Sequence, residues 1–181
     1  MDEQPSLSVP EWLVLAILSE QSRHGFAVAQ LTAHEGELGR VWHIPKAVIY
    51  RSIGRLAEAG LIVPEGTEPG LGPQRTVFAA TADGRAAARR WLHTPVEHVR
   101  DIRSQLLPKL ALIDRAGDDP AGLLHRQRAV LEPIVRAMEA KTVNGGGFEA
   151  TLLAWRKATA IAALDFLDMI TGNPQDAAAP Q

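Results

Sequence analysis

Cysteine is absent from the 181 residues, which excludes disulfide bonds, thiolate metal sites and a cysteine nucleophile. A surplus of positive charge is also missing: the net charge is −2, so a basic coat over the whole surface is excluded. A local basic patch is compatible with this charge, because ligand binding responds to the field at one face rather than to the total.

Long apolar runs are missing as well. The longest, from Trp12 to Leu18, is well short of the roughly 18 residues that cross a bilayer. The first residues, MDEQPSLS, are acidic and precede no apolar stretch with a basic segment. We therefore expect no signal peptide, no membrane partner and a cytoplasmic location.

Sequence signs of catalysis are equally scarce. The six histidines include no His-x-x-x-His pair, and the chain has no Gly-x-Ser-x-Gly motif, phosphate loop or dinucleotide fingerprint. The Gly145–Gly147 run has no strand before it and indicates a turn. We expect no enzyme, no cofactor and no metal site.

What the sequence does contain is a series of helix signals. Ser8, Pro10 and Glu11 form a capping box that predicts a largely apolar first helix. After a break at residues 20–25, a second helix is expected from Gly25 to Ala33. A third helix is expected to begin at Pro45 and to end at Gly60, where a positive φ is easily adopted by glycine.

The third helix has two distinct faces at 100° per residue. The face expected to point inward carries Ile49, Ile53, Leu56, Ala57 and Gly60. The opposite face carries Ala47, Val48, Arg51 and Arg55, with Tyr50 at the edge between the two. Strands are then expected at 61–63 and 76–80, separated by a Gly/Pro-rich tip. Helix, strand, loop, strand is the order of a recognition helix followed by a wing, which points to DNA binding.

The outer face suits the major groove of DNA, because it combines cations with small side chains. Lys46 lies in the first turn, Arg51 and Arg55 extend along the helix, and Arg75 flanks the wing. The start of the second helix favours a phosphate. The candidate DNA contacts are Ser22, Arg23, His24, Lys46, Ala47, Tyr50, Arg51, Arg55 and Arg75. Taken singly, such arginines usually face only solvent and Tyr50 is more often a packing residue; the order of the elements favours DNA.

Three segments resemble the PadR family of bacterial transcriptional regulators: LSVPEWLVLAILSEQSRHGFAVAQ, AVIYRSIGRLAEAGLI and QRTVFAATADGRAAARRWL. The family features correspond to His24–Gly25–Phe26, Tyr50, Leu56–Leu61, Val77–Phe78 and Thr81–Gly84. Two features depart from the family: the wing tip is longer and richer in Gly and Pro, and Gln74 stands where lysine or arginine is frequent. The resemblance implies a winged helix-turn-helix domain, operator DNA as partner, and a homodimer.

Beyond residue 93 the pattern is entirely helical. Helix starts are expected at Thr94–Glu97, which reads as a capping box, and at Asp118–Pro120, with Pro108 and Pro133 breaking or kinking the helices. A glycine turn at 144–147 precedes a last helix from Phe148 to about Ile170. One face of that helix is expected to carry Phe148, Leu152, Trp155, Ala162, Phe166 and Met169. Val99–Leu112 is similar to the start of the family's C-terminal segment, except for Pro108.

We therefore expect a mainly α-helical chain with a small β-hairpin. A winged helix-turn-helix domain would occupy residues 1–93, a C-terminal helical dimerisation domain 94–172, and a disordered tail 173–181. Small residues on the last helix (Ala158, Ala162 and Ala163) permit close approach of a second helix, although the three C-terminal helices could also pack only on one another. Trp91 and Trp155 are candidate surfaces for a small-molecule effector, against the alternative of core packing.

Three functions remain open from the sequence. The leading hypothesis is a dimeric repressor that binds specific DNA and is released by a small molecule. The second is a winged-helix adaptor that docks a partner protein. The third is a small-molecule-binding scaffold without regulatory DNA binding.

Overall fold

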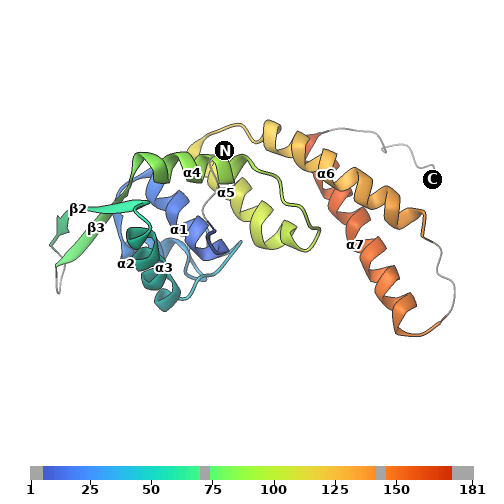
Figure 1. Cartoon of the computed structure of the whole chain (residues 1–181), viewed down its shortest axis with the longest axis horizontal. Coiled ribbons are helices and arrows are strands. Elements are labelled where there is room, and N and C mark those ends of the chain that lie inside the picture. Colours follow the sequence, from blue (N-terminus) through green and yellow to red (C-terminus); the bar gives the residue numbers. More distant parts are fainter. Residues whose placement is uncertain (1–5, 70–73, 142–145, 173–181) are drawn as a thin grey trace. The chain divides into compact units, whose positions relative to one another are not determined.

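The computed structural model describes residues 6–69, 74–141 and 146–172, which form two compact units (Figure 1). The first unit comprises residues 1–93 together with 103–118, and the second comprises 94–102 and 119–181. Among the described residues, no helix is long and apolar enough to cross a membrane.

Helix α1 (Val9–Glu20) is the centre of the first unit. Every residue from Trp12 to Leu18 is buried, as expected of a helix that is apolar on most sides. The amide of Ser8 donates to Glu11 Oε2 at 2.7 Å, which confirms the predicted start of the helix. Helices α3 (Lys46–Glu58) and α4 (Ala82–His93) both pack against α1.

Local capping signals set the ends of the other helices in this unit. Gly60 follows α3 with a φ of 68°, as predicted. Thr81 Oγ1 accepts from the amide of Gly84 at 3.0 Å and so caps α4. Helix α2 (Gly25–Leu31) ends two residues earlier than predicted. The hydroxyl of Thr32, the residue that follows the helix, donates to the Val28 carbonyl at 3.1 Å.

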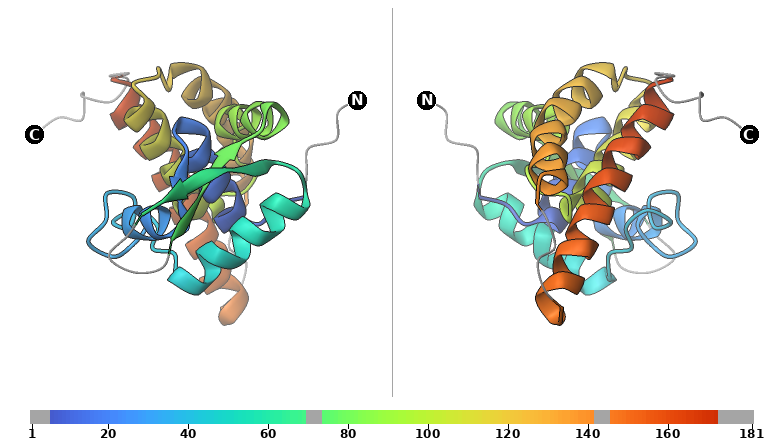
Figure 2. Two further views of the ribbon diagram at one scale, coloured as in Figure 1. Left: turned by 90° about the vertical axis from the view of Figure 1, so that its left-hand side faces the viewer. Right: turned by 90° about the vertical axis from the view of Figure 1, so that its right-hand side faces the viewer.

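A three-stranded antiparallel sheet completes the unit, in the order β1-β3-β2. Strands β2 (Ile62–Glu68) and β3 (Arg75–Ala80) form the predicted hairpin, which extends from the helices on the side of α2 and α3 (Figures 1 and 2). Strand β2 continues well beyond the predicted end at Val63, through a bulge between Pro64 and Gly66. Residues 70–73 of the predicted wing tip lie outside the described residues. Strand β1 (Arg23–His24) was not predicted.

The helix expected to start at Thr94 is absent: residues 94–100 form bends and turns. The reason is a contact distant in sequence, within the second unit. The buried side chain of Gln127 accepts from the amide of Val96 at 2.7 Å and donates to its carbonyl at 2.9 Å. Both main-chain groups of Val96 are thereby bound to the side chain of a residue on α6 (Ala121–Glu139), which holds this segment in its non-helical course.

Pro108 neither breaks nor interrupts the helix in which it lies. A π-helical turn (Ile102–Leu106) leads directly into α5 (Leu107–Ala116), and Pro108 occupies the first turn of α5, where a missing amide is tolerated. Arg115 at the end of α5 donates to Glu20 at 2.8 Å and also contacts Glu37. Hydrogen bonding to Glu20 raises the pKa of Arg115 above its ordinary value. These contacts place α5 in the first unit, whereas the predicted division at residue 93 places it in the second.

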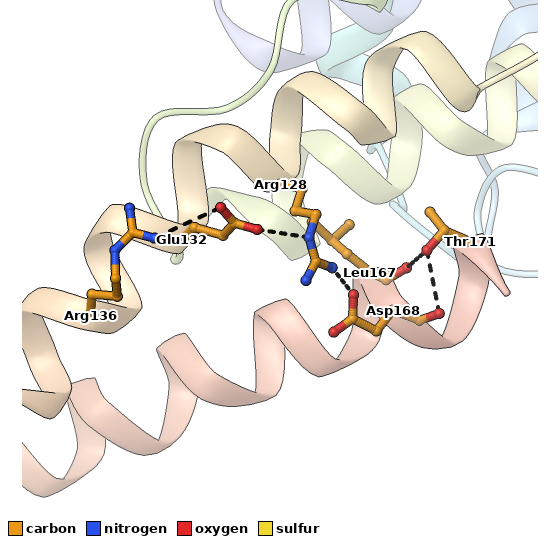
Figure 3. A network of polar contacts seen from close by, with 6 residues as sticks. All are labelled: Arg128, Glu132, Arg136, Leu167, Asp168 and Thr171. Atoms are coloured by element: carbon orange, nitrogen blue, oxygen red, sulfur yellow. Dashed lines mark hydrogen bonds and ion pairs between the residues drawn. The ribbon is translucent and has the colours of Figure 1, made fainter. Parts of the chain in front are cut away.

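The second unit is built on two helices, α6 (Ala121–Glu139) and α7 (Phe148–Thr171), which pack along each other. Asp119 Oδ1 accepts from the amide of Ala121 at 2.9 Å, in keeping with the predicted start of α6. Figure 3 shows a polar network between the helices, in which Arg128 of α6 contacts both Glu132 and Asp168. Residues 144 and 145 of the predicted turn at 144–147 lie outside the described residues.

Helix α7 has the predicted length, but its apolar face is largely uncovered. The residues that pack against α6 are small or aliphatic: Ala160, Ala163 and Leu167. Phe148, Trp155 and Met169 are 75%, 67% and 81% exposed. The prediction that these residues share a face holds, and in this single chain the face points to solvent.

Candidate nucleic-acid interface

Helix α3 presents one face to the core and the other to solvent. Ile49, Ile53 and Leu56 are buried, as predicted, and Ala47 and Arg51 are exposed. Ser52, which was not assigned to a face, is also buried, at 3% exposure. The buried set follows the i, i+3, i+4, i+7 spacing of one helix face, so that Arg51 points outward.

Two residues of α3 were assigned to the wrong face. Ala57 was expected inside but is exposed, and Val48 was expected outside but is half-buried against the core. Both lie about 90° from the centre of the buried set at 100° per residue, and thus at the edges between the two faces. The exposed face is therefore narrower than predicted at its Val48 edge.

The cations of α3 and the wing meet over one aromatic ring. Lys46 Nζ lies 5.4 Å from the ring centre of Phe26, which is in the first turn of α2. Arg75 Cζ, at the start of β3, lies 4.3 Å from the same ring centre. Lys46 Nζ is also 5.9 Å from the ring centre of Tyr50. Three elements thus bring two predicted DNA contacts together at Phe26, which was predicted only as part of the family feature His24–Gly25–Phe26 and not as a DNA contact.

Close approach of α2 and α3 positions Tyr50. A Cβ atom on Gly25 would lie 2.9 Å from Tyr50 Cε1 and 3.0 Å from Ile53 Cδ1, closer than packed atoms normally come. Glycine at this position allows the tyrosine ring to pack against the start of α2. Tyr50 nevertheless remains 47% exposed, so it lies at the edge of the outer face, as predicted.

The three predicted contacts before α2 are partly occupied by structural roles. His24 caps α2, because its Nδ1 accepts from the amide of Ala27 at 2.9 Å, and its Nε2 lies 3.6 Å from Glu68. Arg23 donates to Gln21 at 3.3 Å and belongs to β1, while Ser22 is half-buried. The start of α2 is therefore capped by an imidazole within the chain.

The two arginines of α3 differ in their surroundings. Arg55 Nε lies 3.1 Å from Glu11 Oε1, and the Glu11 side chain is only 4% exposed. Within the described part of the chain, Arg51 makes no ion pair. Arg51 thus contributes a full positive charge to the outer face, whereas the charge of Arg55 is partly balanced.

The two tryptophans proposed for an effector lie in opposite environments. Trp91 is 4% exposed, its ring stacks on Trp12 with centres 5.7 Å apart, and Lys109 Nζ lies 4.8 Å from its centre. The expectation that Trp91 offers a stacking surface is wrong in this structure, because its ring is enclosed by the core. Trp155 lines an open groove of about 500 Å³ in the second unit, together with apolar residues of α6 and α7.

Phe26 could not be identified as part of the site from the sequence. Its spacing relative to Ala29 and Ala33 fits a core stripe equally well, and its neighbours Lys46 and Arg75 lie on other elements. In the described ranges, no group of three or more histidine, aspartate or glutamate side chains is arranged to hold a metal ion.

Comparison with known proteins places this geometry in context. Residues 14–90 match the family model described as the Transcriptional regulator PadR-like family. The chain is similar to Bacillus subtilis PadR in complex with operator DNA, with 18% identity, a TM-score of 0.44, and coverage of 91% of this chain and 98% of that one.

Two further solved structures are similar to the chain. For a Streptococcus mutans UA159 protein the identity is 14%, the TM-score 0.42, and the coverage 90% of this chain and 98% of that one. For a further structure of Bacillus subtilis PadR the identity is 16%, the TM-score 0.41, and the coverage 93% of this chain and 96% of that one. No curated protein sequence matches the chain.

Proposed function

We propose that the chain, whose residues 14–90 match the PadR-like family model, is a dimeric repressor that binds specific operator DNA. The observation that carries the proposal is the outer face of α3, on which Lys46 and Arg51 are exposed and Lys46 shares the ring of Phe26 with the wing cation Arg75. This arrangement supplies positive charge to one face of a chain whose net charge is −2.

In this proposal α3 enters the major groove. The exposed Ala47 permits close approach to the bases, and Lys46 is at the helix end that usually contacts them. Arg51 and Tyr50 bind backbone phosphates, which set the register of the protein on the duplex. Arg75 reaches the backbone from the wing.

The C-terminal helices are the proposed dimer contact. Along α7 the exposed residues Phe148, Trp155, Ala162 and Met169 recur at every seventh position and thus form a nearly straight stripe. If a second α7 packs antiparallel, with position 158 opposite 159, Trp155 lies opposite Ala162 and Phe148 opposite Met169. Large side chains then meet small or flexible ones, as close packing requires.

A two-fold dimer explains how a small domain can select an operator. One winged helix contacts few base pairs, and two of them read half-sites about one helical turn, roughly 34 Å, apart. We propose an operator with approximate two-fold symmetry for this reason.

A mobility-shift assay on the DNA upstream of the chain's own gene tests the DNA-binding proposal. The wild-type protein should shift a discrete fragment, and Arg51→Ala should weaken the shift and reduce the salt dependence by about one phosphate contact. Arg136→Ala, which removes an exposed arginine of the second unit, is the matched control and should bind as the wild type does. Absence of any shift at low salt would overturn the proposal.

The groove beside Trp155 supports release by a small molecule as the regulatory part of the proposal. Trp155 fluorescence should change with an effector, and the effector should weaken operator binding by the same factor by which operator DNA weakens effector binding. A ligand that changes the fluorescence without this reciprocity would favour a binding scaffold instead. If the outer face of α3 docks a protein instead, Arg51→Ala should reduce that docking without a salt dependence.

A further inference from the structure

The ring of Phe26 is shared by two cations from different elements. Lys46 Nζ of α3 lies 5.4 Å from the ring centre, and Arg75 Cζ of β3 lies 4.3 Å from it. Both distances are within the range in which the negative face of an aromatic ring attracts a cation. Lys46 and Arg75 are far apart in sequence, and Phe26 is the residue that both of them contact.

Two like charges near one ring need a compensating group. A carboxylate would balance the two positive charges, but it would also cancel the positive charge that attracts a phosphate. In the part of the chain that the structure describes, neither Lys46 nor Arg75 makes an ion pair with an acid. The aromatic ring stabilises both cations while leaving their full charge available to an anion.

The backbone around Phe26 is anchored on both sides. His24, two residues before it, pairs with Val77 of β3 and caps α2 through Ala27. Gly25 allows α3 to approach so closely that the start of α2 touches Tyr50. The short strand β1 thus ties Phe26 to the wing, and Gly25 ties it to α3, so the ring is held at the junction of the three elements.

We propose that Phe26 is a positioning residue of the DNA-binding face: it holds Lys46 and Arg75 together so that one backbone phosphate is bound by α3 and the wing at once. The inference rests on the proposed binding of double-stranded DNA by this face. Phe26 itself contributes no charge and acts through the two cations. It fixes the spacing of wing and α3, which sets how both fit a single duplex.

The test replaces Phe26 by leucine, which retains an apolar side chain and removes the ring. Its probe is the upstream duplex that the wild-type protein shifts. Phe26→Leu should weaken binding at least 5-fold and lower the salt dependence, because the two cations no longer converge on one phosphate. Phe26→Tyr, which keeps the ring, should bind within about 2-fold of the wild type. Phe78→Leu, an aromatic loss elsewhere in the same unit, should leave the salt dependence unchanged.

A double-mutant cycle separates positioning from a general loss of structure. If Phe26 acts through Lys46, then adding Phe26→Leu to Lys46→Met should weaken binding by less than about 2-fold. Adding Phe26→Leu to Arg75→Met should likewise weaken binding by less than about 2-fold. Thermal unfolding of each variant, followed by circular dichroism, shows whether it is folded, and Phe26→Met replaces Phe26→Leu if the latter is not.

Three results would overturn the inference: wild-type affinity in Phe26→Leu, equal losses in Phe26→Tyr and Phe26→Leu, or independent losses that multiply in the double variants. A wild-type protein that shifts no DNA would instead overturn the proposed function. The two failures are therefore distinguishable.

Discussion

Gly84 and Gly54 both lie inside helices, yet only one of them is required there. A Cβ atom on Gly84 would lie 2.0 Å from the carbonyl oxygen of Leu61, a main-chain atom that cannot move aside. The approach is close because Thr81, which caps α4, also bonds to the carbonyls of Gly60 and Leu61. Around Gly54 there is no atom within 4 Å of the corresponding position among the described residues.

We expect Gly84→Ala to destabilise the first unit by about 1–3 kcal/mol, because α4 must shift away from the start of β2. Gly54→Ala is the matched control and should stabilise by about 0.5–1 kcal/mol, since alanine favours an exposed helix interior. Urea unfolding of both variants measures the difference. Equal effects of the two substitutions would contradict the close approach at Gly84.

A second prediction at this scale concerns Gln127, which is fully buried and satisfies both main-chain groups of Val96. Gln127→Ala should destabilise the second unit by about 1–3 kcal/mol, because a buried amide and carbonyl lose their partners. Gln127→Glu keeps an acceptor for the Val96 amide but loses the donor to its carbonyl. Thermal unfolding should rank the glutamate variant below the wild type, and a variant as stable as the wild type would contradict the account.

At the scale of elements, an ion pair adds to the packing of α3 against α1. Arg55 contacts Glu11, whose carboxylate also accepts from the amide of Ser8 at the start of α1. Replacing Glu11 by glutamine keeps an acceptor for Ser8 and releases the charge of Arg55. We expect Glu11→Gln to strengthen DNA binding about 2-fold and to increase the salt dependence, since one more full cation faces the phosphates.

The shift assay at several salt concentrations checks this prediction. The control is the double variant that combines Glu11→Gln with Arg55→Ala. It lacks the released charge of Arg55, so the gain in DNA affinity should vanish. A gain that survives in the double variant would show that Glu11 acts on DNA binding without Arg55.

Elements whose signals are local could be predicted from the sequence. The start of α1 depends on Ser8 and Glu11, and the start of α4 on Thr81 and Gly84, all within one turn. Strand β1 could not be predicted, because two residues show no alternation and their partner strand lies far along the chain. The capping pattern at Thr94 failed for a similar reason: the main chain of Val96 is held by Gln127, which lies 31 residues further along the chain.

The candidate site likewise has features that depend on local sequence spacing and features that depend on residues distant in sequence. The period of α3 predicted which of its cations are exposed, because helix faces follow directly from spacing. The burial of Trp91 could not be predicted, since it depends on stacking with Trp12 from another helix. Phe26 was overlooked because its role arises only where three elements meet.

At the scale of the whole molecule, the stripe on α7 bears on assembly. Trp155 is 67% exposed and central in the proposed antiparallel contact. Trp155→Ala should weaken the dimer by roughly 1,000-fold, because a two-fold contact loses about 2 kcal/mol at each of two equivalent positions, about 4 kcal/mol in all. Analytical ultracentrifugation without DNA measures the dissociation constant. Tyr50→Ala, which removes an exposed aromatic residue of the first unit, should leave it unchanged.

The substitution of Trp155 should also affect DNA binding. If two half-sites are read together, a variant that is monomeric should bind the intact operator no better than one half-site. A monomeric Trp155→Ala protein with wild-type affinity and cooperativity would contradict the dimeric proposal while leaving DNA binding by each winged helix intact.

Strand β2 is an open edge of the small sheet, and such edges invite other chains to add a strand. Pro64 offers no amide for that pairing, the bulge after it bends the strand, and Glu65 and Glu68 add like charges along it. The opposite edge, β1, is only two residues long. The free edges of the sheet therefore resist pairing with another copy of the chain, which matters if the proposed operator binding brings several copies close together.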